Sequence, residues 1–203
     1  MIIIIDYGLG NLGSLLNMLK KLNVEAKISS DITDFEEADK LILPGVGSFD
    51  QGAYNLKEFK LIDILNKQVI AKKIPILGIC LGMQLFTKQS EEGSLGGLGW
   101  FDAITIKFRF DSQLNLKIPH MGWGPINIRK NNLLFDNITK ESMFYFVHSY
   151  HVICNDHTDI LSTTNYGYDF VSSISRDNII GVQFHPEKSH KYGMKLLENF
   201  SRI

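Results

Sequence analysis

Short runs of branched apolar residues recur through the first half of the chain and alternate with segments of helical periodicity. Runs that are apolar at every position are typical of strands buried on both faces, so they predict a parallel sheet covered by helices. The pattern predicts strands over residues 2–5, 24–28, 40–43 and 74–79, and helices over 12–22, 59–72 and 192–200.

From residue 101 to about residue 180 the expected strands contain more polar residues and are separated by turn signals such as Lys130-Asn131-Asn132. This change predicts a mixed, partly antiparallel extension of the same sheet. The chain has 203 residues and shows no repeat and no linker, which suits one compact domain. We therefore expect a single α/β domain over residues 1–203, with a mixed, mostly parallel sheet and helices on both faces.

The charge balance argues against several classes of function. Lys and Arg total 21 and Asp and Glu total 22, giving a net charge of −1, so no field recruits nucleic acid or an anionic membrane. The apolar opening stops at Asp6, too early for a signal peptide or a membrane span. Cys80 and Cys154 have no CxxC spacing, so we expect no disulfide framework and no metal site, and a reduced cytoplasmic setting. We expect no cofactor.

One motif points to a nucleotide. Gly8-Leu9-Gly10-Asn11-Leu12-Gly13 reads as G-x-G-x-x-G between an expected strand and a helix, and Asp31 lies near the position of a ribose-binding acid. Glycines at a tight strand-to-helix turn satisfy the same pattern without a ligand, and Asp31 falls in a region typical of a loop and helix cap. Dinucleotide binding by an oxidoreductase is therefore kept as the weaker alternative.

The most specific local signal is Gly78-Ile79-Cys80-Leu81-Gly82, which follows the apolar Pro75-Ile76-Leu77. G-x-nucleophile-x-G is the pattern of a nucleophile elbow, in which the reactive side chain sits at a sharp strand-to-helix turn. A helix that begins at Leu81 would direct its N–H groups toward the sulfur and favour the thiolate. A lone cysteine is more often structural, but the two glycines favour function.

A cysteine nucleophile needs a base and a group that orients the base. Gly181 to Ser189 contains His185-Pro186-Glu187, and Pro186 favours an extended His185. In an extended segment residues i and i+2 share a side, so Glu187 can hold the imidazole. A plain turn after a strand is the alternative for this segment taken alone.

An oxyanion needs backbone donors. Pro44-Gly45-Val46-Gly47-Ser48 ends an expected strand at the same edge of the sheet, so Val46 or Gly47 can supply one N–H and Leu81 another. A simple strand-to-helix turn explains this loop equally well on its own.

These segments together resemble the class I glutamine amidotransferases, whose fold is flavodoxin-like, and in particular the glutaminase subunits of imidazole glycerol phosphate synthase. The resemblance extends along nearly the whole chain. It is carried by Asp6–Asn11, Pro44–Phe49, Gly78–Gln84, Pro119–Trp123, Tyr145–Tyr150 and Gly181–Ser189.

The resemblance implies hydrolysis of L-glutamine to glutamate and ammonia through a thioester on Cys80, with His185 and Glu187 completing a triad. It implies a (β/α)8-barrel cyclase partner that receives the ammonia and makes imidazole glycerol phosphate and AICAR in histidine biosynthesis. It implies glutamine-binding positions at Gln84, Glu92, Ser149 and Tyr150. Positions at or near the partner and the ammonia passage would be Asn11, His120, Trp123, Tyr145 and Lys188.

One position departs from the family, since Gly124 stands where Met-Gly-Trp is usually followed by Asn. A paralogous glutaminase that supplies ammonia for amidation of a bacterial surface sugar is therefore a second hypothesis. The remaining hypotheses are a stand-alone amidase or peptidase and a catalytically silent binding subunit. The other histidines His151, His157 and His190 are expected to be exposed or to cap helices.

Overall fold

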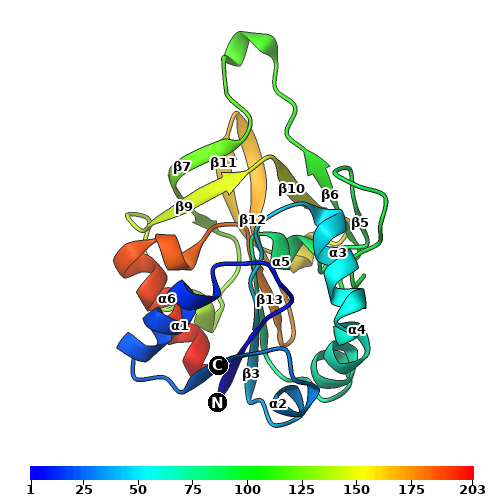
Figure 1. Ribbon diagram of the computed structural model, residues 1–203. Helices are drawn as coiled ribbons and strands as arrows, with labels where there is room; N and C mark the ends of the chain where they lie inside the picture. The colour runs from blue at the N-terminus through cyan, green and yellow to red at the C-terminus, as the bar shows by residue number, and fades with distance from the viewer.

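The computed structural model describes residues 1–203, apart from the side chain of Ser112. Its centre is an eleven-stranded sheet with the order β2-β1-β3-β4-β13-β12-β10-β6-β5, in which β11 pairs with β12 and β8 (Figure 1). The strands are β1 Ile2–Ile5, β2 Ala26–Ser29, β3 Lys40–Leu43, β4 Ile76–Ile79, β5 Gln89–Ser90, β6 Ala103–Lys107, β8 Asn127–Ile128, β10 Tyr150–Cys154, β11 Ile160–Tyr166, β12 Tyr168–Arg176 and β13 Ile179–Val182.

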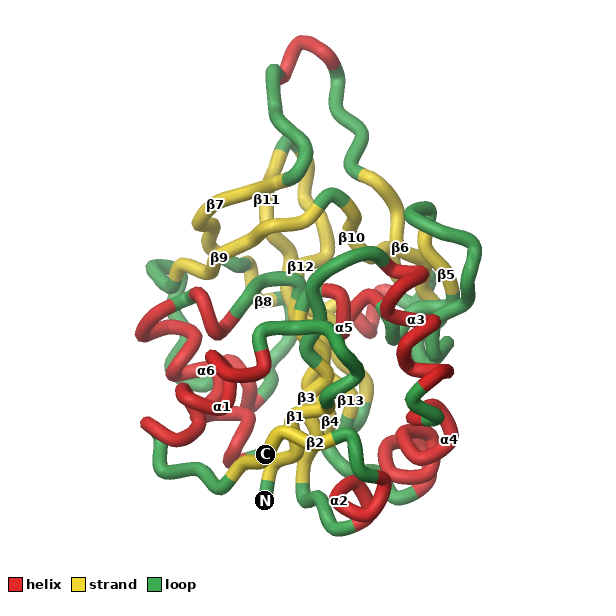
Figure 2. Tube along the Cα trace, viewed as in Figure 1, coloured by secondary structure: helices red, strands yellow, loops and turns green.

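Helices cover both faces of the parallel half, as predicted (Figure 2). Every residue of β1 is buried because its side chains alternate between two covered faces. Ile3 and Ile5 pack in a cluster with α2, α3 and α4, whereas Ile2 and Ile4 pack in a second cluster with α1 and α6. The helices are α1 Leu12–Lys21, α2 Ile32–Glu36, α3 Phe49–Glu58, α4 Leu61–Leu65, α5 Leu81–Gln84 and α6 His190–Arg202. No helix among the described residues is long and apolar enough to span a membrane.

The segment between α3 and β4 differs from the single helix expected over 59–72. Lys60 adopts a left-handed conformation with φ of 57°, which separates α3 from α4. The chain then continues from α4 into a π-helical segment, Asn66–Ala71. The π-helical hydrogen bonds place an extra residue in each turn, and sequence periodicity carries no signal for that change.

The second half extends the sheet with antiparallel strands, as expected, but not with all of them. β7 (His120–Pro125) and β9 (Met143–His148) pair only with each other, in a separate two-stranded antiparallel sheet. The expectation that residues 101–180 form one extension is therefore wrong for these two strands. β9 is instead held beside the segment that follows β13, where His185 N donates to Tyr145 O over 2.9 Å.

Three neighbouring parallel strands bring distant segments to one edge of the sheet. β4 lies between β3 and β13, with Leu43 paired to Gly78 and Val182 paired to Ile79. Because parallel strands end at the same edge, the loops after β3, β4 and β13 emerge side by side.

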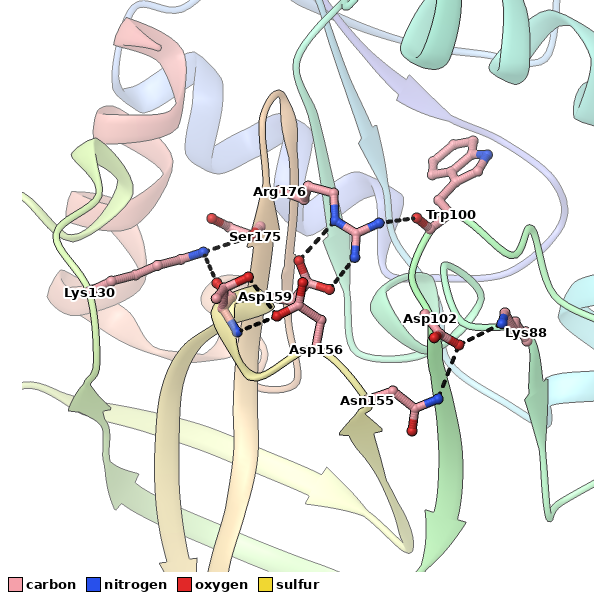
Figure 3. A network of polar contacts seen from close by, with 10 residues as sticks. Lys88, Trp100, Asp102, Lys130, Asn155, Asp156, Asp159, Ser175 and Arg176 are labelled. Carbon is pink, nitrogen blue, oxygen red and sulfur yellow. Dashed lines mark hydrogen bonds and ion pairs between the residues drawn. The ribbon is translucent and has the colours of Figure 1, made fainter.

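A polar network ties together loops at the opposite edge of the sheet (Figure 3). Arg176, at the end of β12, forms an ion pair with the buried Asp159 and donates to the Trp100 carbonyl over 3.3 Å. Lys130 donates to the Ser175 carbonyl over 2.7 Å. Since Arg176 pairs with Ile179, the first residue of β13, this network stabilises the end of the sheet away from residue 185.

Candidate active site

Cys80 lies at the turn between β4 and α5, as the elbow pattern predicts. Its backbone has φ of 54° and ψ of −108°, a conformation that non-glycine residues rarely adopt. The flanking glycines are required by packing: a Cβ at Gly78 would come within 2.5 Å of the Phe86 ring, and one at Gly82 within 1.9 Å of the Leu43 carbonyl oxygen. The helix does begin at Leu81, but α5 is a single turn, so its dipole contributes less than a long helix would.

His185 and Glu187 form a buried hydrogen-bonded pair after β13. His185 Nδ1 lies 2.8 Å from Glu187 Oε1, and the two side chains are 1% and 2% exposed. Because a carboxylate only accepts, Nδ1 carries a proton and Nε2 is left to act as the base. Among the described residues Nε2 has no hydrogen-bond partner, and it belongs to a side chain that lines the same pocket as Cys80.

The environment of His185 favours its charged form. Burial alone would lower its pKa, but contacts with Cys80 and with Glu187 outweigh burial and raise the pKa of His185 to about 10. An imidazolium stabilised in this way is the natural counter-ion of a thiolate, the reactive form of cysteine.

The loop after β3 closes the other side of the sulfur. Val46 and Gly47 line the pocket together with Leu81, and Val46 is 41% exposed. Gly47 has φ of 119°, which requires glycine. The start of the loop is fixed by the buried Tyr7, whose hydroxyl donates to the Pro44 carbonyl over 2.7 Å. Burial, and then the proximity of Cys80, raise the pKa of Tyr7, so it remains a donor.

The pocket has a volume of about 490 Å³ and collects the residues expected to hold glutamine. Gln84 Nε2 donates to the Tyr150 carbonyl over 3.1 Å, and Glu92 Oε2 accepts from Phe49 N over 2.8 Å. Ser149 lines the pocket beside Tyr150. All four expected positions are therefore brought to the cavity that contains Cys80.

Most residues expected at the partner surface lie on or beside the β7–β9 sheet. Trp123 is 44% exposed, is paired with Tyr145 across the two strands, and packs edge-on against its ring. Lys188 Nζ lies 5.7 Å from the centroid of the Tyr145 ring and lines the pocket. Asn11 lies apart from this sheet, at the start of α1, and its Oδ1 accepts from Ser14 Oγ over 3.0 Å.

His120 differs from these residues because it is buried. Its Nδ1 lies 3.2 Å from His148 Nε2, and its ring stacks on Tyr166 with the centroids 4.0 Å apart. Burial lowers the pKa of His120 to about 4 and that of His148 to about 3. His151, expected to be exposed, is also buried, with its Nε2 2.8 Å from the Tyr168 hydroxyl.

The glycine-rich turn near the N-terminus is explained by packing. Gly10 has φ of 111°, and a Cβ there would approach Pro44 Cβ to 2.9 Å, so the glycine allows the turn to contact the loop after β3. Asp31 caps α2 by accepting from Thr33 N over 2.9 Å. Both features thus have structural roles that need no dinucleotide.

Two residues near the sulfur were not singled out from the sequence, Tyr7 and Gln183. The side chain of Gln183 is fully buried, and its Nε2 lies 3.5 Å from Cys80 Sγ. Its position two residues before His185 in an extended segment was the available signal, since such residues share a side. Among the described residues, no group of three or more His, Cys, Asp or Glu side chains is arranged to hold a metal ion.

Fold and site define an α/β enzyme with a cysteine at a strand-to-helix turn and a His–Glu pair just after the neighbouring strand. The chain belongs to the class-I glutamine amidotransferases, whose family model matches residues 3–203. It is 58% identical over 200 residues to imidazole glycerol phosphate synthase subunit HisH 2 of Methanococcus maripaludis, covering 98% of each chain. It is 48% identical to the protein of the same name from Pseudomonas aeruginosa, covering 100% of both.

Solved structures share the fold at low sequence identity. PurLQS from Thermotoga maritima superposes with a TM-score of 0.75 at 17% identity, covering 98% of this chain and 96% of that one. A second solved structure, described as a glutamine amidotransferase, gives a TM-score of 0.71 at 16% identity, covering 99% of both chains. The predicted fold class is thereby confirmed.

Proposed function

We propose that the chain is the glutaminase subunit of an imidazole glycerol phosphate synthase, which releases ammonia from L-glutamine for a partner protein. The carrying observation is that Cys80 and His185 line one pocket, with Glu187 paired to His185 behind it, in a chain of this family. The names of the full-length relatives support the assignment to this synthase. The continuous sheet supports treating residues 1–203 as one domain.

The chemistry begins with proton transfer from the Cys80 thiol to His185 Nε2. The sulfur attacks the side-chain amide carbon of glutamine, and backbone N–H groups of Leu81 and of Val46 or Gly47 stabilise the oxyanion. The C–N bond breaks as His185 returns the proton to the leaving nitrogen, which departs as ammonia and leaves a γ-glutamyl thioester. His185 then takes a proton from water, which attacks the thioester, and glutamate leaves as the sulfur regains its proton.

Glutamine recognition follows from the polar lining of the pocket. The Glu92 carboxylate can accept from the α-ammonium group of the substrate, and Ser149 and Tyr150 line the same pocket. Both N–H groups of Gln84 are used by protein acceptors, which leaves its Oε1 to accept from the substrate.

The partner is a (β/α)8-barrel cyclase that docks on the rim formed by Trp123, Tyr145 and Lys188. A half-exposed tryptophan beside the mouth of the pocket is the type of anchor that protein interfaces favour. Asn11, before α1, and the buried His120, on β7, complete the set of positions that we assign to the partner and the ammonia passage. Ammonia passes to the cyclase, which makes imidazole glycerol phosphate and AICAR, and the complex works in the cytoplasm.

The test compares Cys80→Ala with Cys154→Ala, which removes the other thiol. Cys80→Ala should reduce glutamate release on the order of 10⁶-fold, to the detection limit, because the nucleophile is lost. Cys154→Ala should retain activity. Glutamate is measured with the purified full-length chain, alone and with the cyclase and its nucleotide substrate. Normal glutamate release by Cys80→Ala would disprove the mechanism.

A second ammonia acceptor, a surface sugar, is favoured by one observation. Gly124 is buried beside Trp123 on β7, and the atoms nearest to a Cβ there would belong to Phe146 and Thr164 at 3.5 Å, an ordinary contact. The fold therefore does not require glycine at this position, so packing does not explain this departure from the family pattern, and we keep the second acceptor as a hypothesis. Purifying the native partner and assaying it with the nucleotide or with a keto or amide sugar substrate separates the two acceptors.

A further inference from the structure

Gln183 lies in the segment between β13 and His185, and its side chain is fully buried. Its backbone N–H donates to the Ser172 carbonyl over 2.9 Å, which fixes the main chain against β12. Its amide lies between two functional groups, with Nε2 3.5 Å from Cys80 Sγ and Oε1 3.0 Å from Gln84 Nε2.

A backbone carbonyl fixes the orientation of both amides. Gln84 places one amide atom 3.1 Å from the Tyr150 carbonyl oxygen, which only accepts, so that atom is the nitrogen. The same nitrogen contacts Gln183, which must therefore present its oxygen to Gln84 and its nitrogen to the sulfur. Neither amide can therefore be flipped. Gln84 donates to Gln183, and Gln183 donates to Cys80.

The carbonyl at the start of this chain is itself held in place. His148 Nδ1 lies 2.7 Å from the same Tyr150 oxygen, and its Nε2 lies 3.2 Å from His120 Nδ1. The Tyr150 oxygen thus accepts from two side chains. Both donors, Gln84 and His148, are buried, so they have little freedom to reorient.

We propose that Gln183 is a further catalytic residue of the glutaminase reaction, donating a hydrogen bond to the Cys80 sulfur, and that Gln84 is its positioning residue. The proposal deepens the proposed function and rests on it. An N–H on one side of the sulfur excludes the thiol proton from that side, so the proton is directed elsewhere, toward His185. A hydrogen bond donated to the thiolate also stabilises its charge during attack and when it leaves the thioester.

The test replaces Gln183 with methionine, which matches its size and carries no donor. Alkylation of Cys80 by iodoacetamide at neutral pH should slow by about tenfold, because a hydrogen bond to a charged group is lost. With the cyclase and its nucleotide present, kcat for glutamine should fall by about tenfold while KM stays within about twofold. Alkylation is read by peptide mass, which reports Cys80 and Cys154 separately.

Gln51→Met, an exposed glutamine on α3, is the matched control and should leave both rates unchanged. If Gln183→Met does not fold, Gln183→Asn decides by the same readouts, because its amide is too short to reach from Gln84 to the sulfur. A folded variant with wild-type alkylation and kcat overturns the proposal, as does a change in KM alone, which indicates a structural role. Alkylation needs no glutamine, so it tests the hydrogen bond to the sulfur separately from the glutaminase reaction. If the wild-type chain releases no glutamate but Gln183→Met is still alkylated slowly, the proposed function is refuted and the hydrogen bond from Gln183 to Cys80 is not.

Discussion

The two cysteines of this chain have opposite surroundings. Cys80 has a strained backbone and lies beside the histidine of the buried His–Glu pair. Cys154 packs in the apolar core near Asp159, and burial followed by that carboxylate raises its pKa to about 12. A thiol of that kind stays protonated at neutral pH, which supports the assignment of the nucleophile to Cys80.

At the residue scale, the charge of His185 depends on the sulfur. Cys80→Ala removes the largest of the contacts that raise the pKa of His185 and leaves burial, which lowers it. The pKa of His185 is therefore expected to fall well below 10 in this variant. Titration of the imidazole by ¹⁵N NMR measures it, with Cys154→Ala as the control that should match the wild type. An unchanged His185 pKa in Cys80→Ala would contradict the ion-pair arrangement.

The sequence predicted three residues that the structure brings together at the candidate site, but it did not single out Gln183 and Tyr7 beside them. Cys80, His185 and Glu187 belong to residue types with few alternative roles, and each lies in a motif whose spacing has a geometric meaning. Gln183 and Tyr7 are placed by hydrogen bonds to distant segments: Gln183 meets a residue 99 positions away and Tyr7 one 37 positions away. Such pairings depend on how strands are ordered in the sheet, which local sequence does not specify.

At the element scale, glycine allows α5 to approach β3. Gly82→Ala would place a Cβ 1.9 Å from the Leu43 carbonyl oxygen, so helix or strand must shift. We expect a loss of about 3 kcal/mol in the free energy of unfolding, at the upper end for overpacking, and reduced glutaminase activity because Leu43 precedes the loop that we propose to hold the oxyanion. Urea unfolding of the variant measures the change.

Gly13→Ala is the matched control, since it adds the same methyl group in α1 with no heavy atom within 4 Å of the new Cβ. Alanine is the better helix former, so this variant should gain about 0.5–1 kcal/mol. Equal stability of the two variants would show that the contact between α5 and β3 is not tight.

Elements with strong periodicity were predicted well, and those determined by tertiary contacts were not. The expected helix over 12–22 corresponds to α1, and the expected strand over 40–43 to β3. No helix was predicted at α3, because it buries only Phe49, Gly52 and Leu56, and Gly52 allows close packing on α5 rather than marking an apolar stripe. The separate pairing of β7 and β9 follows from contacts with the active-site segment.

At the scale of the whole molecule, buried neutral histidines make stability depend on pH. The pKa of His120 is about 4 in the folded chain and about 6.5 when unfolded, so the unfolded chain binds the proton first as the pH falls. Its contribution is fully present above about pH 6.5 and is lost as the pH falls toward 4, and the loss amounts to about 2 kcal/mol at pH 5. His148 acts in the same direction.

His120→Phe tests this, because the ring stacks on Phe146 and Tyr166 and a phenyl group fits the same place. The difference in unfolding free energy between about pH 7.5 and pH 5, measured with urea, should shrink by about 2 kcal/mol relative to wild type. His157→Ala, at an exposed position, should leave the difference unchanged. Carboxylates contribute equally to the pH dependence of stability in all three proteins. If the difference in unfolding free energy between the two pH values is the same for His120→Phe and wild type, the prediction is refuted.

The placement of β3, β4 and β13 as adjacent parallel strands has a consequence for how such a protein can diversify. The residues of the proposed triad and the loop beside them lie at the carboxyl ends of three strands, β3, β4 and β13, which we call the catalytic cassette. The connection from β6 to β7 and the β7–β9 ribbon belong to a separate, peripheral layer. Changes in that layer would redirect where ammonia is delivered, provided that they spare Val147 and His148 at the end of β9, which line the pocket. Grafting the peripheral layer of one relative onto the cassette of another is thus a direct route to a glutaminase with a new recipient.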